Sequence, residues 1–390
     1  MKQSNIITGI DIGTSKISVI VCDVKSAEDI EILGLGTSIL KGVQKGIIKD
    51  KVLFLNSLQN SLKRAQAASD QVVQDIFINI PNGNNKFSVQ TGIIQNTTDE
   101  LLSVKYRDEA MKKSMNCIEK KDQSILHLIP ISQRIDGVKT NVINSRKFET
   151  IEIDTGIILG DSSNLKLIIS EIKNMDLKVR GIISDFLSLG SVILPQESSK
   201  SFLIIDCGAQ LTSLSIYKGN QLIFAHTIEI GSEQITNDLS ICLKCSFSEA
   251  ERIKILFGQL KKFNNELAKN ITINSHNGQK KIKASLVTSI IESRINQLFQ
   301  LIQKYLIYAP GFDEIVLTGS GSNLKGMKEW ASMKLGKPIH SSNDQFQANI
   351  NITPNYIVAM GQIIYGYQRG LLKNRSQNFI DSIRKKFFIN

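Results

Sequence analysis

The alternation of apolar and polar positions near the N-terminus predicts three consecutive strands. Apolar runs at Ile6–Asp11, Ile17–Val24 and Ile30–Ser38 are separated by short polar or glycine-containing stretches. Runs of this length, bounded by turn residues, are typical of strands joined by tight turns. We therefore expect a meander of three strands, followed by a helix over residues 50–69, where apolar residues recur at helical spacing.

The turn between the first two strands carries candidate phosphate ligands. Asp11 is followed by Gly13, Thr14, Ser15 and Lys16. Backbone N–H groups, two hydroxyls and an ammonium can bind phosphate oxygens, and the carboxylate can hold a hydrated Mg²⁺ against the same phosphates. The turn is neither a Walker loop nor a dinucleotide fingerprint, because GxxxxGK[ST] and a helix-opening GxGxxG are both missing.

A weaker copy of this hairpin lies half a chain further on, at Asp206 and Gly208. Two such hairpins predict a duplicated fold with a ligand between its halves. A third element is the strand at 314–318, which leads through Gly319 and Gly321 into a helix. Glycine at such a turn lets the backbone approach a flat ligand, such as an adenine ring, closely.

The segment 81–160 reads as a small inserted α/β unit, and the first half resumes after it. The elements expected in this unit are a helix over Asp99–Ile118, a strand Ser124–Ile129 halted by Pro130 and a strand Phe148–Ile153. The apolar run Leu165–Ile169, a helix to Met175 and the run Val179–Ile183 then resume the first half. The second half is expected to continue with helices over about 231–305, interrupted by a polar stretch and a strand-like run.

Composition narrows the class of protein. A chain of 390 residues should hold two or more domains, and its net charge of +11 suggests an anionic partner. The basic residues are spread widely, which does not favour nucleic acid. Five scattered cysteines read as reduced thiols, and the four histidines form no metal-binding spacing. We expect neither a secretory leader nor a membrane-spanning helix.

The segment 376–390 can be drawn as an amphipathic helix with one apolar face and flanking bases, which suits a membrane interface. A single helix of this kind should bind weakly, and several on one polymer should bind firmly. The alternative is a terminal helix that docks on its own domain. The residues expected at the membrane are Phe379, Ile380, Ile383, Arg384, Lys385, Lys386 and Phe387.

Taken together, these motifs resemble the FtsA family of bacterial cell-division proteins, within the actin/Hsp70/sugar-kinase ATPase superfamily. The resemblance runs over nearly the whole chain in the family's order, through residues 9–16, 126–130, 206–208, 315–319 and 356–361. It implies an α/β, actin-like fold with two RNase H-like domains flanking a nucleotide cleft and an inserted FtsA-specific α/β subdomain.

The resemblance also implies a division of the chain. The first actin-like core would take 1–80, 161–194 and about 350–372, and the inserted subdomain 81–160. The second core would take 195–235 and 305–349, the FtsZ-binding subdomain 236–304, and the membrane helix 376–390.

By the same resemblance, the cofactors are ATP and Mg²⁺, with the metal held through water by Asp11 and Asp206. Glu251 and Lys254 would flank the adenosine, although such a pair is also common on exposed helices. Arg294 would face the C-terminal peptide of FtsZ, and a solvated surface arginine is the alternative.

The chain departs from the family pattern in the second phosphate loop, usually Asp-x-Gly-Gly-Gly-Thr-x-Asp. Ala209 and Gln210 stand where glycines are usual; they tolerate positive φ poorly, and we expect their side chains to crowd the phosphates. Ser320 replaces a glycine of the third turn. We therefore expect weak or altered nucleotide binding and at most weak ATPase activity. Asp185 is a candidate to orient the attacking water, or else the N-cap of the helix that follows.

The expected function is that of an actin-like adaptor that binds ATP, forms filaments, binds FtsZ and tethers the division ring. It would be peripheral, on the cytoplasmic face of the membrane at the septum, with other division proteins as partners and no nucleic acid. Two alternatives remain open: a small-molecule kinase of the same superfamily, and an actin-like relative from pilus assembly.

Overall fold

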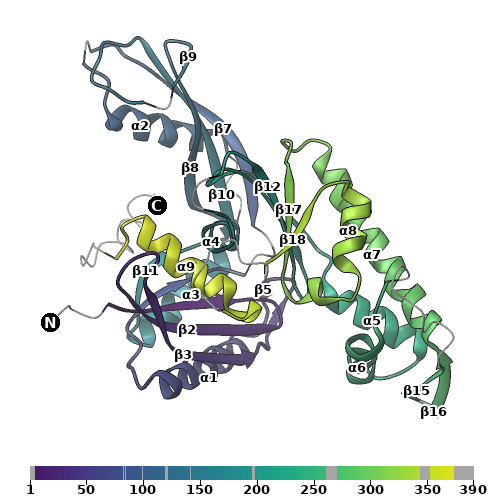
Figure 1. Cartoon of the computed structure of the whole chain (residues 1–390). Helices are drawn as coiled ribbons and strands as arrows, with labels where there is room; N and C mark the ends of the chain where they lie inside the picture. The colour runs from purple at the N-terminus through teal and green to yellow at the C-terminus, as the bar shows by residue number, and fades with distance from the viewer. Residues whose placement is uncertain are drawn as a thin grey trace.

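The computed structural model describes residues 5–81, 83, 85–98, 100–118, 122–140, 142–195, 198–260, 270–342 and 352–372. Two large lobes lie side by side, and a smaller sheet with one helix projects from the first lobe (Figure 1). The amphipathic segment 376–390 lies outside the described residues. Among the helices that are described, none has the length and apolar character to cross a membrane.

The first lobe is built on a five-stranded sheet in the order β11-β6-β1-β2-β3. Its first three strands form the antiparallel meander that the apolar pattern predicts, and two parallel strands extend it from β1. The helix expected over 50–69 is confirmed as α1, whose N-cap Asp50 accepts a hydrogen bond from the Leu53 amide. The strands and helices of this lobe are β1 (Ile6–Ile12), β2 (Lys16–Val24), β3 (Ile30–Ile39), β4 (Val43–Gln44), β5 (Ile47–Ile48), α1 (Lys51–Ser69), β6 (Asp75–Ile78), α3 (Ser162–Asn174) and β11 (Lys178–Ile182).

The second lobe repeats this topology with the sheet order β14-β13-β12-β17-β18. Again three antiparallel strands form a meander, and two parallel strands extend the sheet from the first of them. Its elements are β12 (Ser201–Cys207), β13 (Thr212–Lys218), β14 (Gln221–Ile228), α5 (Ser232–Leu243), α6 (Phe247–Phe257), β15 (Asn270–Ser275), β16 (Gly278–Lys283), α7 (Ala284–Leu306), β17 (Glu314–Thr318), a 3₁₀ turn (Ser320–Asn323), α8 (Met327–Leu335) and β18 (Ile339–Ser341).

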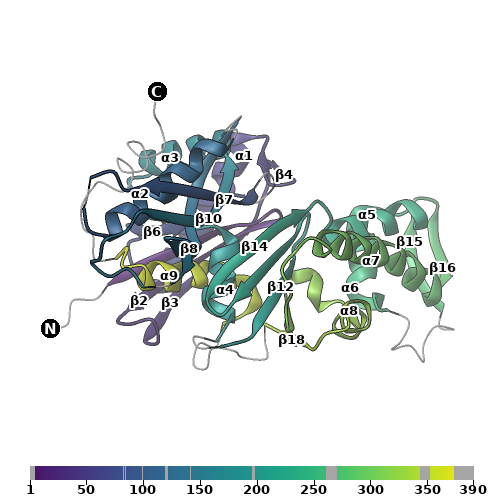
Figure 2. The same ribbon diagram turned by 90° about the horizontal axis from the view of Figure 1, so that it is seen from above.

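Two helices join the lobes: α4 (Asp185–Ile193) and, after a 3₁₀ turn at Pro354–Tyr356, α9 (Ile357–Gln368). They pack closely, since a Cβ on Gly361 would lie 2.1 Å from the Ser188 carbonyl oxygen. Buried side chains of both helices share one hydrophobic core with residues of both sheets. Viewed from above, α4 lies where the two lobes meet (Figure 2). The two lobes are therefore joined by a packed apolar core around α4 and α9 rather than by a flexible linker.

The projecting unit differs from the sequence prediction in several places. Its sheet has the order β7-β10-β8-β9, and the long β7 was not predicted. The helix spans only Val104–Ser114, with a short 3₁₀ turn after it, rather than 99–118. The run 165–169, further along the chain, lies wholly within α3. The elements of the unit are β7 (Lys86–Gln95), α2 (Val104–Ser114), a 3₁₀ turn (Met115–Cys117), β8 (Gln123–Ile135), β9 (Val138–Lys139) and β10 (Thr150–Asp161).

The prediction that Pro130 halts its strand is wrong. The strand β8 continues to Ile135, and Pro130 lies opposite Thr155 where the register with β10 shifts. At such an irregularity a missing N–H removes no regular ladder hydrogen bond, so proline is tolerated there.

Candidate functional site

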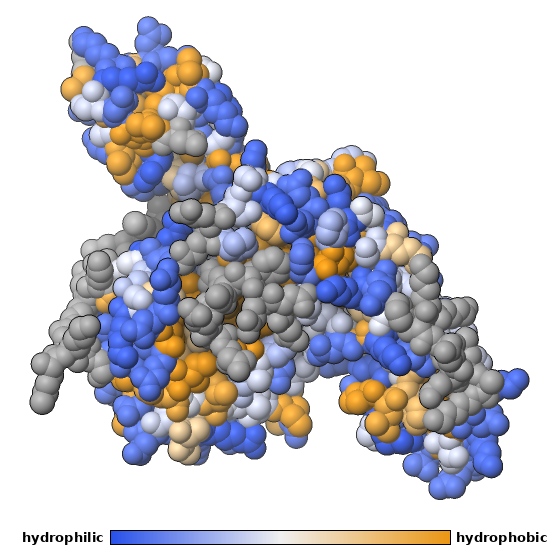
Figure 3. Space-filling model, viewed as in Figure 1, coloured by the Kyte–Doolittle hydropathy of each residue, from blue (hydrophilic) through white to orange (hydrophobic). Residues whose placement is uncertain are grey.

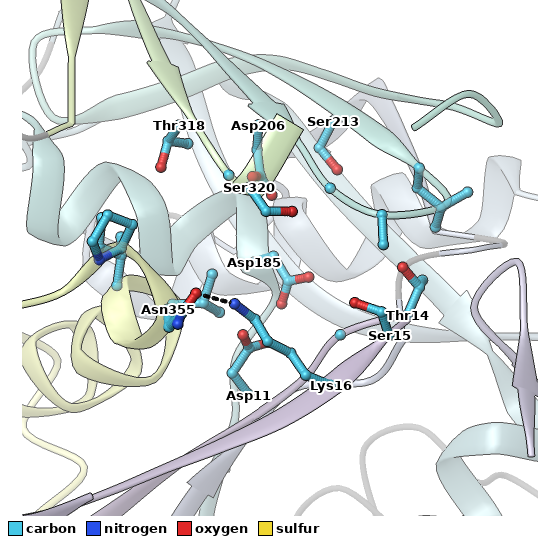
Figure 4. Close-up of a pocket in the computed structure, with 18 of the residues that line it drawn as sticks. Asp11, Thr14, Ser15, Lys16, Asp185, Asp206, Ser213, Thr318, Ser320 and Asn355 are labelled. Atoms are coloured by element: carbon cyan, nitrogen blue, oxygen red, sulfur yellow. Dashed lines mark hydrogen bonds between the residues drawn. The ribbon is translucent and has the colours of Figure 1, made fainter. Parts of the chain in front are cut away.

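The first and second turns face each other across a cavity of about 100 Å³ between the lobes. In Figure 4, Asp11, Thr14, Ser15 and Lys16 come from one wall, and Asp206 comes from the opposite wall. Segments far apart in sequence are thus brought together as predicted. The full lining is Asp11, Ile12, Gly13, Thr14, Ser15, Lys16, Asp185, Leu189, Asp206, Gly208, Ala209, Leu211, Ser213, Thr318, Gly319, Ser320, Pro354, Asn355, Ile357 and Val358.

The two turns have the same local geometry. The Gly13 amide donates to the Lys16 carbonyl oxygen at 3.1 Å, and the Gly208 amide donates to the Leu211 carbonyl oxygen at 2.9 Å. A Cβ on Gly208 would lie 2.9 Å from that same Leu211 oxygen, so the tight turn requires glycine. Each aspartate is therefore fixed near the end of a strand, two residues before its turn glycine.

Three carboxyl groups share this cavity. Burial raises the pKa of Asp11 to about 7, with Lys16 opposing the shift and Asp206 adding to it. Burial also raises the pKa of Asp206 to about 6, again opposed by Lys16. Asp185 has a pKa raised well above its usual range by burial and by the charge of Asp11. Ionising all three carboxyl groups is therefore costly in the ligand-free protein, because burial and mutual repulsion outweigh the attraction of Lys16.

Lys16 is the cation among these carboxyl groups. Burial lowers its pKa, while Asp11 and Asp206 raise it, and its ammonium donates a hydrogen bond to Asn355 Oδ1. Within the described residues, no three His, Cys, Asp or Glu side chains are grouped as a metal site.

Asn79 is a site residue that the sequence analysis missed. It follows β6, is fully buried, and its Nδ2 donates to Asp11 Oδ1 at 3.1 Å and Asp185 Oδ1 at 2.6 Å. Its Oδ1 accepts from the Ile12 amide at 2.7 Å, which fixes the orientation of the side-chain amide. The sequence did hold one signal for this residue. Asn79 comes directly after an apolar strand, and that strand pairs parallel with the strand that carries Asp11.

The interpretation of Asp185 as a helix N-cap is wrong. The N-cap of α4 is Ser184, and Asp185 is the first residue of the helix. Its carboxyl group faces the cavity and accepts from Asn79, so it lies near the other two acids (Figure 4). The reason is that the helix begins one residue earlier than predicted, since the amides of Leu187 and Ser188 both donate to the Ser184 carbonyl oxygen.

The third turn depends on glycine at one position. Gly319 has φ of +82°, and a Cβ there would lie 2.4 Å from Asp206 Oδ1 and 2.5 Å from the Cys207 carbonyl oxygen. Gly319 and Ser320 line the cavity. Gly321 lies just beyond it, where a Cβ would be 3.5 Å from that of Ser232.

Glu251 and Lys254 lie on α6, outside the cavity lining. They form an ion pair of 2.8 Å, and the Lys254 ammonium donates to Thr236 Oγ1 at 2.8 Å and to the Ser232 carbonyl oxygen at 3.2 Å. Since Ser232 is also the neighbour of Gly321, the pair supports the rim next to the third turn.

Arg294 lies on α7 and is engaged within its own lobe. Its guanidinium makes two hydrogen bonds to Asp238 of α5, at 2.6 and 2.7 Å. One quarter of the Arg294 side chain remains exposed. This is a bidentate arginine–carboxylate ion pair, which is stronger than a pair joined by a single hydrogen bond.

The altered second turn behaves differently from the expectation. Neither Ala209 nor Gln210 has a positive φ, and Gln210 does not line the cavity. Its side chain instead reaches Lys45 of the first lobe and Glu233 of the second. The expected crowding of phosphates by the Gln210 side chain is therefore wrong, because hydrogen-bond partners outside the cavity draw it away.

Comparison with known proteins finds similarity to one family. Residues 203–361 match the family model described as "Cell division protein FtsA". The chain is 25% identical to the FtsA of Buchnera aphidicola subsp. Acyrthosiphon pisum, over 99% of this chain and 97% of that protein. It is 24% identical to the FtsA of Borreliella burgdorferi, over 94% and 92% of the two chains. The chain is therefore similar to FtsA over nearly its whole length.

The solved structures agree on the fold. The chain superposes on a chain of the PilM–PilN type IV pilus biogenesis complex with a TM-score of 0.67 and 14% identity, covering 95% of this chain and 99% of that one. With MreB 5 of Spiroplasma citri bound to AMPPNP, the TM-score is 0.58 at 13% identity, with coverages of 95% and 98%. The predicted actin-like α/β fold is confirmed.

Proposed function

We propose that this relative of FtsA is an actin-like, ATP-binding adaptor of bacterial cell division. The observation that carries the proposal is the pair of matching turns, whose aspartates Asp11 and Asp206 line one cleft together with Lys16. Three carboxyl groups lie here with one ammonium, and their raised pKa values mean that the ligand-free protein stabilises their charged forms poorly. A divalent cation would stabilise those charged forms, so the site suits one.

The residues present fit ATP with Mg²⁺. Thr14, Ser15 and Lys16 would bind phosphate oxygens, and Asp11 and Asp206 would hold the hydrated metal. The sharp turn at Gly319 would admit the adenine ring, with Gly208, Gly321, Glu251 and Lys254 supporting the walls. Asp11 and Asp206 would hold Mg²⁺ through its waters, and the metal would supply charge neutralisation to the phosphates.

Hydrolysis is proposed to be weak at most. Asp185 is the candidate to orient a water, because it is buried at the cavity and held by Asn79. Burial and the charge of Asp11 raise its pKa well above the usual range, which disfavours the charged form that would act as a base. The nucleotide then acts mainly as a ligand that contacts both lobes and promotes assembly, rather than as a substrate.

The proposed partner of the 236–304 region is the C-terminal peptide of FtsZ. An apolar patch covers part of this region (Figure 3), where Ile255 and Leu256 of α6 are 70% and 60% exposed. A peptide carrying both apolar and acidic residues would bind such a patch and compete with Asp238 for Arg294. Self-association into filaments and contacts with other division proteins are part of the same proposal.

The proposed location is the cytoplasmic face of the membrane at the division site. The basis is the amphipathic pattern of 376–390, including Phe379, Ile383 and Phe387. Deleting 377–390 should release the protein from vesicles of anionic lipid while leaving its binding to the FtsZ peptide unchanged. Unchanged sedimentation with vesicles after the deletion would refute the anchor.

The nucleotide part is tested by calorimetric titration with ATP in the presence of Mg²⁺, together with release of inorganic phosphate. We expect binding with slow or no turnover. Turnover at about 10 s⁻¹, typical of metabolic enzymes, would favour a kinase instead. No binding of any adenine nucleotide would refute the proposal.

A further inference from the structure

Gln210 joins the two lobes at one end of the cleft. Its backbone amide donates to Thr14 Oγ1 at 3.2 Å, and its Oε1 accepts from the Lys45 backbone amide at 2.6 Å. Its Nε2 donates to Glu233 Oε2 on α5 at 2.9 Å. Gln210 thus binds two separate turns of the first lobe, and its contact with Glu233 holds it to the second lobe. We call these contacts the Gln210 clasp.

The Lys45 side of the clasp is braced. Lys45 adopts φ of +47° in the turn between β4 and β5, and its ammonium pairs with Glu229 at 2.8 Å. Asn164 of α3 holds this hairpin to the first lobe, donating to the Gly46 carbonyl oxygen at 2.8 Å and accepting from the Ile48 amide at 3.1 Å. The clasp therefore connects two firmly held elements rather than two free loops.

The bond between Thr14 and Gln210 lies where the two turns come closest. The amides of Gly13 and Gly208 are already used within their own turns. A phosphoryl group placed between the turn tips would have to displace the bond between Thr14 and Gln210. The cavity beside them, about 100 Å³, is also small against the roughly 300–1,000 Å³ of typical small-molecule sites.

We propose that Gln210 is a specificity-determining residue that makes the closed cleft favour a nucleoside diphosphate over a triphosphate. The proposal rests on the proposed nucleotide site and deepens it. On this proposal the base would lie near Gly319 and the phosphates of a diphosphate near Ser15 and Lys16, which line the same cavity. The additional phosphoryl group of a triphosphate would lie at the bond between Thr14 and Gln210 and open it.

The test is calorimetric titration of the full chain with Mg-ADP, Mg-ATP and adenosine. We expect the wild type to bind Mg-ADP at least about 10-fold more tightly than Mg-ATP, the scale of one or two hydrogen bonds. Gln210→Ala removes both side-chain bonds that hold the loop against Thr14. It should bring the two affinities to within about 3-fold by strengthening ATP binding, with adenosine binding unchanged.

A control variant keeps the test specific. Lys45→Ala removes the exposed ion pair with Glu229 but retains the backbone amide that Gln210 binds, and it should keep the preference for the diphosphate. If Gln210→Ala fails to fold, Glu233→Ala releases the side chain from the other end and should shift the ratio in the same direction.

The outcomes separate the two proposals. If both nucleotides bind and their ratio is the same in the wild type and in Gln210→Ala, the role of Gln210 is refuted and the nucleotide site stands. A wild type that prefers Mg-ATP refutes it as well. If the folded wild type binds neither nucleotide, both proposals fail.

Discussion

The two turns that face the cleft share a backbone and differ in what their side chains do. In each, a glycine amide closes the turn onto a carbonyl oxygen three residues on, at 3.1 and 2.9 Å. The first turn directs Thr14, Ser15 and Lys16 into the cavity, whereas the second sends Gln210 outward to the opposite lobe. The same hydrogen-bonded backbone turn can therefore carry different side chains, and those side chains decide which groups reach the ligand site.

The largest expected effect is on metal-dependent binding, and it tests whether both turns serve one ligand. Asp11→Asn and Asp206→Asn should each weaken Mg-nucleotide binding by about 100-fold, the scale for removing one partner of a buried charge pair. Calorimetry with Mg²⁺ and with EDTA gives the two affinities. An effect at Asp11 alone would mean that the second turn takes no part in holding the ligand.

Gly319→Ala should destabilise the fold by about 2–3 kcal/mol, because the side chain needs a positive φ and meets Asp206 and Cys207 of the second turn. Gly336→Ala is the matched control, since Gly336 also has a positive φ, of +66°, but nothing lies within 4 Å of its Cβ position. It should cost only about 1 kcal/mol. Urea unfolding compares the two, and equal losses would show that the second turn is not tightly packed there.

Asp11 and Asp206 should stabilise the ligand-free protein less as the pH rises from about 4 to 7, and buried His127, whose pKa is lowered to about 4, partly opposes this trend. The pKa values of Asp11 and Asp206, about 7 and about 6 in the folded protein, lie above their ordinary value of 3.8. The folded state therefore binds more protons than the unfolded state in this window, and the stabilisation is lost as the groups ionise.

Melting temperatures at pH 5 and pH 7.5, with and without Mg-nucleotide, measure this effect. Asp11→Asn should flatten the slope, and a bound cation should reduce it. A stability that rises equally in the wild type and in Asp11→Asn would contradict the raised pKa values.

The smallest expected effect is at the bond between the turns. Thr14→Val keeps the shape but leaves the Gln210 amide without its hydroxyl partner, and should cost about 1 kcal/mol. Ser15→Ala, on the same turn, is the control and should be within about 0.5 kcal/mol of the wild type. Chemical denaturation of the ligand-free protein compares them. Equal stability of the two variants would show that the turns do not support each other.

The local pattern was enough to predict the elements of both meanders, the three cleft-facing turns and their meeting across one cavity. Short stretches such as 6–24 and 201–217 contain both the apolar spacing of the strands and the turn residues between them. The actin-like fold followed from the resemblance of these motifs, and the superpositions confirm it.

What failed depended on partners distant in sequence. Pro130 is tolerated within β8 because of a register shift opposite Thr155. Asn79 matters because Asp11 and Asp185 converge on it from positions 68 and 106 residues away. Gln210 turns outward because Lys45, 165 residues away, offers a backbone amide. Local propensity carries no signal of such partners.

The central claim, that both turns close around one metal–nucleotide pair, is tested most directly by a crystal structure grown with ADP and Mn²⁺ in place of Mg²⁺. The account predicts one strong anomalous peak between Asp11 and Asp206, with the phosphates against Ser15 and Lys16 and the base beside Gly319. A nucleotide bound elsewhere, or a metal that touches neither aspartate nor its waters, would contradict it.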